Sequence, residues 1–173
     1  AIFGLNTPPL SLMKAQYFKI CSKRFNCLLF NVSKLTISYD FAVFENSFND
    51  TFLELAFVEV SSDGANYYRF PPTSNSQYTV QYNNAASIDA TKLDNLAGKY
   101  RSLYGTPFDL QELSSIPQLN VNAITHVKIV DVVGSINTLY ATYDKNSNII
   151  NDPWPTAFGS SGFDLDGVGV IHQ

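Results

Sequence analysis

Residues 53–70 have the clearest pattern of apolar and polar positions in the chain, with the sequence LELAFVEVSSDGANYYRF. An apolar run from Ala56 to Val60 is followed by polar residues, and an aromatic run begins at Tyr67. Asp63 and Gly64 stand between the runs, where glycine adopts a positive φ without steric cost and aspartate tolerates it. The pattern predicts a β-hairpin.

Four further segments have the period of two, or the apolar and aromatic composition, that is typical of strands. They are residues 38–48, 77–82, 124–133 and 163–171. We expect the first and the last of these to be central strands. In residues 124–133, Val127 and Ile129 fall on one face, and Val130 and Val132 fall on the other.

Residues 91–103 have the best helical pattern, because Leu93, Leu96, Ala97 and Tyr100 lie at positions i, i+3, i+4 and i+7. Asp89 or Thr91 could cap this helix. Short strands separated by long polar loops, without an internal repeat or a linker, predict an all-β protein. We expect one antiparallel β-sandwich domain over residues 1–173, with one or two short helices.

The composition narrows the class of protein. Of the 173 residues, 15% are charged and 14% are aromatic, which is typical of an extracellular β protein. A net charge of −4 makes nucleic acid an unfavourable partner. No apolar run approaches the roughly 18 residues of a membrane span. Cys21 and Cys27 could form a disulfide in an oxidising compartment or could be two buried thiols.

The first 39 residues differ from the remainder of the chain. Up to residue 40 the chain has five basic residues and one acid, Asp40, although the whole chain is acidic. This segment has no clean period of 2 or 3.6 residues. It could be an irregular strand pair, a basic surface for an acidic partner, or a stretch of incorrectly determined sequence.

Two resemblances carry implications for fold and location. The hairpin sequence resembles that of galactose-binding-like jelly rolls. The segments FAVFENSF, LELAFVEVSSDGANYYRF, NLAGKYRSLYGTPFDL, ITHVKIVDVVGSI and NDPWPTAFGSSGFDLDGVGVIHQ, in this order, are similar to a group of secreted or lipid-anchored cell-surface proteins of Bacteroidota. This likeness covers residues 40–173 and does not include residues 1–39. It implies an exported β-sandwich, and some members of the group lie beside outer-membrane uptake systems, including those for corrinoids.

Acids and amides gather where the expected strands end. Oxygen ligands on flexible loops suit Ca²⁺, which takes six to eight of them. The candidate ligands of a structural calcium ion are Glu45, Asn46, Asp50, Asp164 and Asp166. The alternative is that they are solvated turn residues and strand caps. Asp164 and Asp166 are two apart on a strand, which favours a metal or capping pair over the two carboxylates of a glycoside hydrolase.

Aromatic residues give the candidate ligand platform. Trp154 lies between Pro153 and Pro155, and a loop stiffened by proline presents a flat ring with little ordering cost. We expect Trp154, Tyr67, Tyr68 and Asp152 to bind ligand, with the alternative that Trp154 plugs one end of the sandwich. His126 and His172 have no catalytic partner at motif spacing, so no catalytic residue is predicted.

Together these features predict a noncatalytic ligand-binding module at the outer cell surface, with a glycan as its ligand. The alternative is an accessory binding protein of an outer-membrane corrinoid (vitamin B12) uptake system. A third possibility is an enzyme acting on polysaccharide, which would need two carboxylates in one cleft and a raised pKa on one of them.

Overall fold

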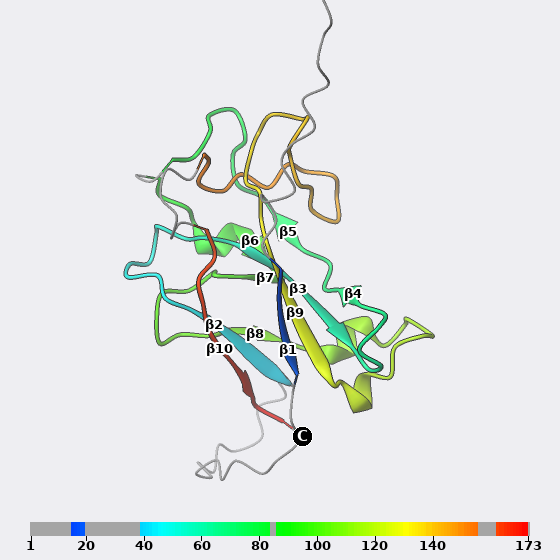
Figure 1. Ribbon diagram of the computed structural model, residues 1–173. Coiled ribbons are helices and arrows are strands. Elements are labelled where there is room, and N and C mark those ends of the chain that lie inside the picture. Colours follow the sequence, from blue (N-terminus) through cyan, green and yellow to red (C-terminus); the bar gives the residue numbers. More distant parts are fainter. Residues whose placement is uncertain (1–14, 20–38, 84–85, 156–161, 173) are drawn as a thin grey trace, which may run out of the picture.

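The computed structural model describes residues 15–19, 39–83, 86–155 and 162–172. Within these ranges the chain forms short antiparallel strands and three single 3₁₀ turns, and no longer helix (Figure 1). The elements are β1 (Ala15–Lys19), β2 (Phe41–Glu45), β3 (Ala56–Ser61), β4 (Tyr68–Arg69), β5 (Thr73–Ser74), η2 (Ala90–Lys92), β6 (Leu93–Asp94), β7 (Leu96–Ala97), β8 (Thr106–Phe108), η3 (Leu110–Leu113), η4 (Val121–Ala123), β9 (His126–Asp131) and β10 (Leu165–Val170). The predicted all-β, antiparallel class is confirmed. Cys21 and Cys27 lie outside the described residues, as does most of the atypical segment 1–39.

The larger sheet has the strand order β1-β9-β3-β4, and β7 also pairs with β3. The predicted hairpin is confirmed, since β3 and β4 are antiparallel neighbours with Glu59 opposite Arg69. Its turn is held by the Asp63 carboxylate, which accepts hydrogen bonds from the backbone N–H groups of Ala65 and Asn66, each at 2.8 Å. Gly64 has a φ of 77°, the left-handed conformation that this turn requires.

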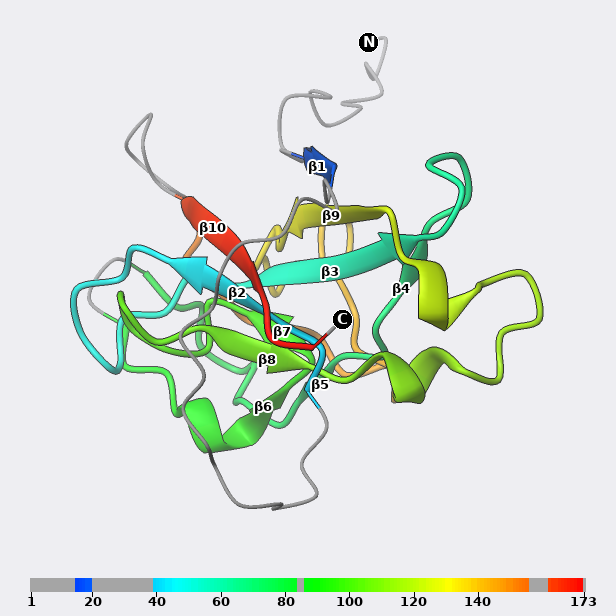
Figure 2. The same cartoon turned by 90° about the horizontal axis from the view of Figure 1, so that it is seen from below.

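A three-stranded sheet with the order β10-β2-β8 lies against one face of the larger sheet (Figure 2). Their shared core contains Phe41 and Phe108 from the smaller sheet, with ring centroids 5.4 Å apart, and Val58 and Ile129 from the larger one. The prediction that residues 38–48 contain a central strand is confirmed by β2. The last strand, β10, is instead at the edge of its sheet among the described strands.

The other face of the larger sheet is covered by irregular chain. Because side chains alternate along a strand, Phe57 and Val130 point away from the first core. They join a second cluster with residues from outside β3 and β9: Leu53, Leu55, Ile88, Leu93, Leu96, Val132 and Ile150. The strands β3 and β9 are therefore buried on both faces, which a simple two-sheet sandwich does not require.

The helix predicted for residues 91–103 is wrong. Asn95 and Gly98 have positive φ values of 53° and 80°, so a helix cannot continue through them. Leu93 and Leu96 are buried because β6 pairs with β5 and β7 pairs with β3. Only the predicted cap is seen, since the Asp89 carboxylate accepts from the N–H of Thr91 at the start of η2. Residues 77–82 also form no strand.

Candidate functional site

The structure separates the four predicted ligand-binding residues into two pairs. Asp152 accepts a hydrogen bond from the N–H of Leu55, just before β3, whereas Tyr68 is opposite Val60 near the end of β3. Five residues of a strand place these two positions about 17 Å apart. Tyr67 and Tyr68 are half-buried, while Asp152 is only 3% exposed. The four residues therefore do not form one surface.

The five predicted calcium ligands are also divided. Glu45 is 1% exposed and close enough to Asp164 for their charges to interact. Asn46, Asp50 and Asp166 are exposed, and an Asp50 oxygen lies 3.8 Å from a guanidinium nitrogen of Arg101. Two members of the predicted set are brought together, and three face solvent.

Glu45 and Asp164 belong instead to a larger group, which we call the carboxylate cluster. It collects acids from five separate segments of the chain: Glu45, Glu54, Asp131, Asp152 and Asp164. Backbone N–H groups hold four of them, through the bonds Ser47 to Glu45 (2.7 Å), Gly162 to Glu54 (2.9 Å), Phe163 to Asp131 (3.2 Å) and Leu55 to Asp152 (3.3 Å).

Burial dominates the electrostatics of the carboxylate cluster. Loss of hydration raises the pKa of Glu45 to about 7, with smaller contributions in the same direction from Glu54 and Asp164. Burial likewise raises the pKa of Glu54. It raises the pKa of Asp152 well above its ordinary value, and the charges of three other cluster acids add to this. The charged neighbours that shift these three pKa values are all acids, so the group favours protons or a cation.

The cluster fits a metal ion only in part. Glu45 Oε1 and Asp152 Oδ1 are buried and have no hydrogen-bond partner within the described structure. However, in the described ranges no three acidic, histidine or cysteine side chains are placed so that they could hold one ion together. Calcium therefore stays a prediction, and no step in the proposals below depends on it.

Sequence reasoning missed Glu54 and Asp131 as cluster members. Each is a single acid inside an apolar run, in Leu53-Glu54-Leu55 and Val130-Asp131-Val132. An acid in such a position is a signal, because a strand buried on both faces brings it into the interior. The alternation along each strand does not say which acids meet.

The side-chain amides of Asn151 and Gln81 join the loops at one end of the molecule, seen at the top of Figure 1. The buried Asn151 amide donates to the carbonyls of Gln77 (2.9 Å) and Val80 (2.8 Å), and its oxygen accepts from the Gln81 side chain (3.0 Å) and the N–H of Tyr82 (3.1 Å). Gln81 Oε1 in turn accepts from the N–H of Ile136 at 2.9 Å. These two amides fasten residues 77–82 to residues 134–154.

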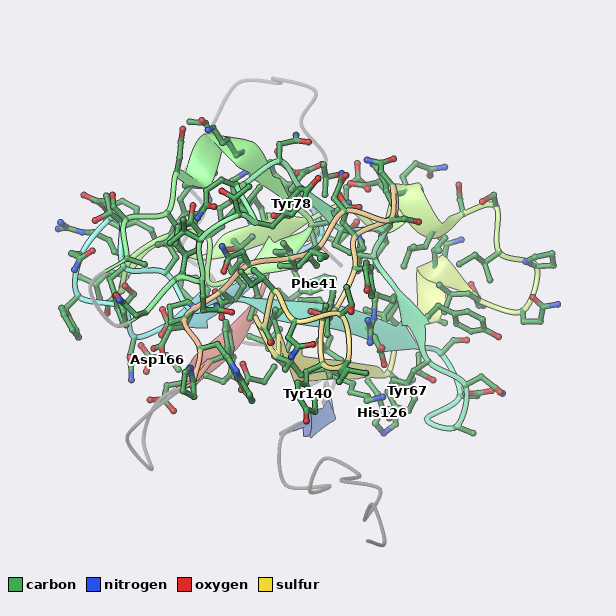
Figure 3. All side chains as sticks on the ribbon, turned by 90° about the horizontal axis from the view of Figure 1, so that it is seen from above. Phe41, Tyr67, Tyr78, His126, Tyr140 and Asp166 are labelled. Atoms are coloured by element: carbon green, nitrogen blue, oxygen red, sulfur yellow. The ribbon has the colours of Figure 1, made fainter. Side chains whose placement is uncertain are left out.

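The two joined loops, residues 77–82 and 134–154, contain five aromatic side chains. Tyr78 and Tyr143 are exposed, and Tyr82, Tyr140 and Trp154 are half-buried. The N–H of Trp154 donates to the carbonyl of Tyr82 at 3.0 Å, so the proline-flanked loop lies directly beside residues 77–82. Figure 3 looks down on these loops and labels Tyr78 and Tyr140. We call Tyr78, Tyr82, Tyr143 and Trp154 the aromatic platform.

No family model matches this chain, and no curated protein or solved structure is similar to it at a significant level. Among the described helical segments, none is long and apolar enough to cross a membrane. Function is therefore inferred from the chemistry of the sites themselves.

Proposed function

We propose that this protein is a noncatalytic ligand-binding module at the outer cell surface, that its sheets belong to the jelly-roll type, and that its ligand is a glycan. The observation that carries the proposal is the pair of amides, Gln81 and Asn151, that holds together two long loops, each with an exposed tyrosine, Tyr78 or Tyr143. The low charge and high aromatic content of the chain support the extracellular location.

The aromatic platform has the chemistry that a sugar needs. Tyrosine and tryptophan present a large apolar face together with a polar edge, and the CH-rich face of a sugar ring can stack on the former. The buried Asn151 uses both its donor and its acceptor on loop backbone, so the loops are ordered before ligand arrives. Loops ordered in advance lose little entropy on binding, which raises affinity without additional contacts.

The carboxylate cluster gives less support to a hydrolase. The acid and the base of a glycoside hydrolase must reach the scissile bond. Glu45 and Asp152 are instead buried, and each already accepts a hydrogen bond from a backbone N–H group. A raised pKa of Glu45 is thus explained by burial within the protein, without a substrate.

Trp154→Ala tests the proposal. Wild-type protein is first screened against a glycan panel, polysaccharides and cobalamin, and the best glycan is titrated by calorimetry. We expect Trp154→Ala and Tyr78→Ala each to weaken binding by about 5- to 100-fold, the range for an aromatic hot spot, with an unchanged Tm. Tyr104→Ala, which removes an exposed tyrosine outside the platform, serves as the control and should bind as wild type does.

Several results would count against the proposal. A fall of about 3 to 5 kcal/mol in the stability of Trp154→Ala would show that this ring plugs the loop end. Binding of cobalamin alone would favour the corrinoid alternative. Release of sugars from a polysaccharide would instead make the protein an enzyme.

A further inference from the structure

Two neighbouring loops carry the most exposed large apolar side chains of the described residues. Phe48 is 82% exposed in the loop between β2 and β3, and Leu103 is 87% exposed in the loop between β7 and β8. Both loops lie side by side at one end of the molecule in Figures 1 and 2. We call Phe48 and Leu103, with the flanking Tyr100 and Tyr104, the apolar tip.

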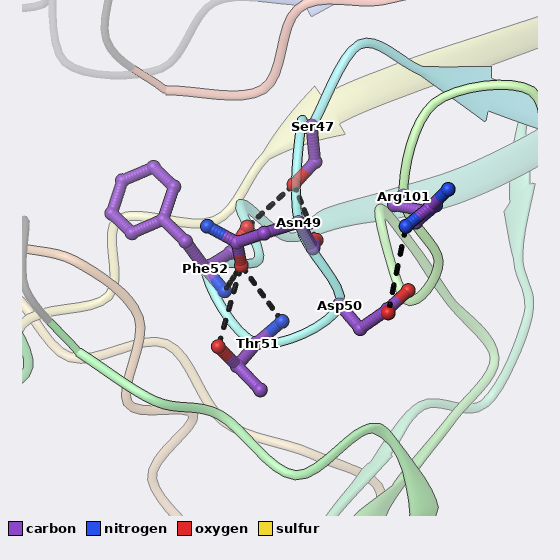
Figure 4. A network of polar contacts seen from close by, with 6 residues as sticks. All are labelled: Ser47, Asn49, Asp50, Thr51, Phe52 and Arg101. Carbon is purple, nitrogen blue, oxygen red and sulfur yellow. Dashed lines mark hydrogen bonds and ion pairs between the residues drawn. The ribbon is translucent and has the colours of Figure 1, made fainter.

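Hydrogen bonds hold the tip in place. The N–H of Ser102 donates to the carbonyl of Ser47 at 2.6 Å, which ties the two loops together. Within the first loop, Ser47 Oγ donates to the carbonyl of Phe52 at 2.6 Å, and Asn49 Oδ1 accepts from the N–H of Phe52 at 2.6 Å (Figure 4). The exposure of Phe48 is therefore a property of an ordered loop.

Leu103 is held outward at a conformational cost. Its φ is 75°, a left-handed conformation that is unfavourable for a leucine, whose Cβ crowds the backbone. A residue kept in such a conformation is more often found at a functional site than elsewhere. The chain thus keeps a large apolar side chain in water at a position whose φ glycine and asparagine adopt more readily.

The rim of the tip combines tyrosine with positive charge. Lys99 Nζ lies 5.6 Å from the ring centroid of Tyr100, and the Arg101 guanidinium lies 5.9 Å from that of Tyr104. Residues 98–105 contain these two bases and no acid, although the chain has a net charge of −4. An oxygen of the exposed Asp50 lies 3.8 Å from a guanidinium nitrogen of Arg101.

We propose that the apolar tip inserts into the headgroup region of a bilayer that contains anionic phospholipid. An apolar apex surrounded by tyrosine and by lysine or arginine matches the layers of a membrane surface from the acyl boundary outward. Two apolar side chains with two basic ones produce shallow, reversible association, in which anionic headgroups supply part of the attraction. This inference concerns another surface than the glycan proposal and does not depend on it.

Vesicle sedimentation tests the inference, with the 173-residue chain and vesicles of phosphatidylcholine mixed with phosphatidylglycerol. We expect wild type to bind these vesicles more tightly than vesicles of phosphatidylcholine alone. Phe48→Ser and Leu103→Ser should each weaken binding by about tenfold or more, because each removes one side chain from the apolar region. Leu139→Ser is the matched control, since Leu139 is 79% exposed elsewhere and its loss should leave binding unchanged.

The inference is overturned if wild type binds neither vesicle, or if Leu139→Ser weakens binding as much as Leu103→Ser does. It is also overturned if the protein self-associates without lipid and the two tip variants abolish that association, which would make the tip a protein interface. Circular dichroism of each variant confirms that the fold is retained. Glycan binding by Phe48→Ser should equal that of wild type, so failure of either proposal is seen separately.

Discussion

Replacing Glu45 by glutamine should make the protein more stable above neutral pH. Glu45 is almost fully buried, and its carboxylate lies among other acids at the base of the loop that begins at Ser47. Glutamine has nearly the same shape, and its Oε1 can still accept the hydrogen bond from Ser47 N–H. The substitution thus removes the ionisation and keeps most of the packing.

The magnitude follows from the pKa of Glu45, which burial raises from 4.5 to about 7. Because the folded state holds the proton more tightly than the unfolded state does, ionisation opposes folding. The free energy of unfolding therefore falls as pH rises from about 4.5 to about 7, and stays at the lower value above this range. The loss amounts to as much as about 3 kcal/mol, since one pKa unit corresponds to about 1.4 kcal/mol.

Urea denaturation at several pH values between about 4 and 8 measures this effect. One series is run with chelator, and a second series is run with calcium in place of the chelator. We expect Glu45→Gln to lose the part of the pH slope that Glu45 supplies, and to exceed wild type in stability above about pH 7. Asp94→Asn, which removes one exposed carboxylate on β6, is the matched control for the change from an acid to an amide.

Two outcomes would refute this reasoning. If Glu45→Gln is less stable than wild type at high pH in chelator, the ionised carboxylate has a stabilising partner that outweighs its loss of hydration. If both proteins have the same slope, Glu45 does not titrate in this range. A gain in stability with calcium that occurs in wild type and not in the variant would instead support the predicted calcium site.

Two further predictions concern the loops. Asn151→Ala should lower the free energy of unfolding by about 2 to 4 kcal/mol, because it leaves the carbonyls of Gln77 and Val80 without their buried donor. Denaturant titration measures the loss, and a loss below about 0.5 kcal/mol would contradict this prediction. Leu103→Gly should raise the free energy of unfolding by up to about 1 kcal/mol, because glycine adopts the φ of 75° without strain. Calorimetry measures the Tm of this variant, and a lowered Tm would show that Leu103 makes stabilising contacts.

Features that depend on neighbours in the chain could be predicted. The hairpin is encoded by the Asp63-Gly64 turn and the apolar and aromatic runs on either side of it, which form the antiparallel neighbours β3 and β4. The predicted division of residues 124–133 between two faces is also confirmed, since Val127 and Ile129 enter one core and Val130 and Val132 enter the other. Alternation along a strand needs no knowledge of the partner strand.

The segment from Leu93 to Ala97 shows where local patterns fail. Apolar residues at i, i+3 and i+4 satisfy a helix, but they satisfy equally well two short strands separated by a residue in the left-handed conformation. The choice between them depended on β5 and β3, which supply the pairing partners of β6 and β7.

The candidate sites depend most on tertiary structure. Glu54 and Gly162 are 108 residues apart in sequence and form one hydrogen bond, and Asp152 is 97 residues from the N–H of Leu55 that it accepts from. The sequence by itself determined the strand-rich class, the hairpin and the abundance of oxygen donors, since each follows from residue type and local spacing. Which carboxylates were buried together, and which apolar side chains were left in water, was decided only when the two sheets and their covering loops packed, because burial is a property of the whole chain.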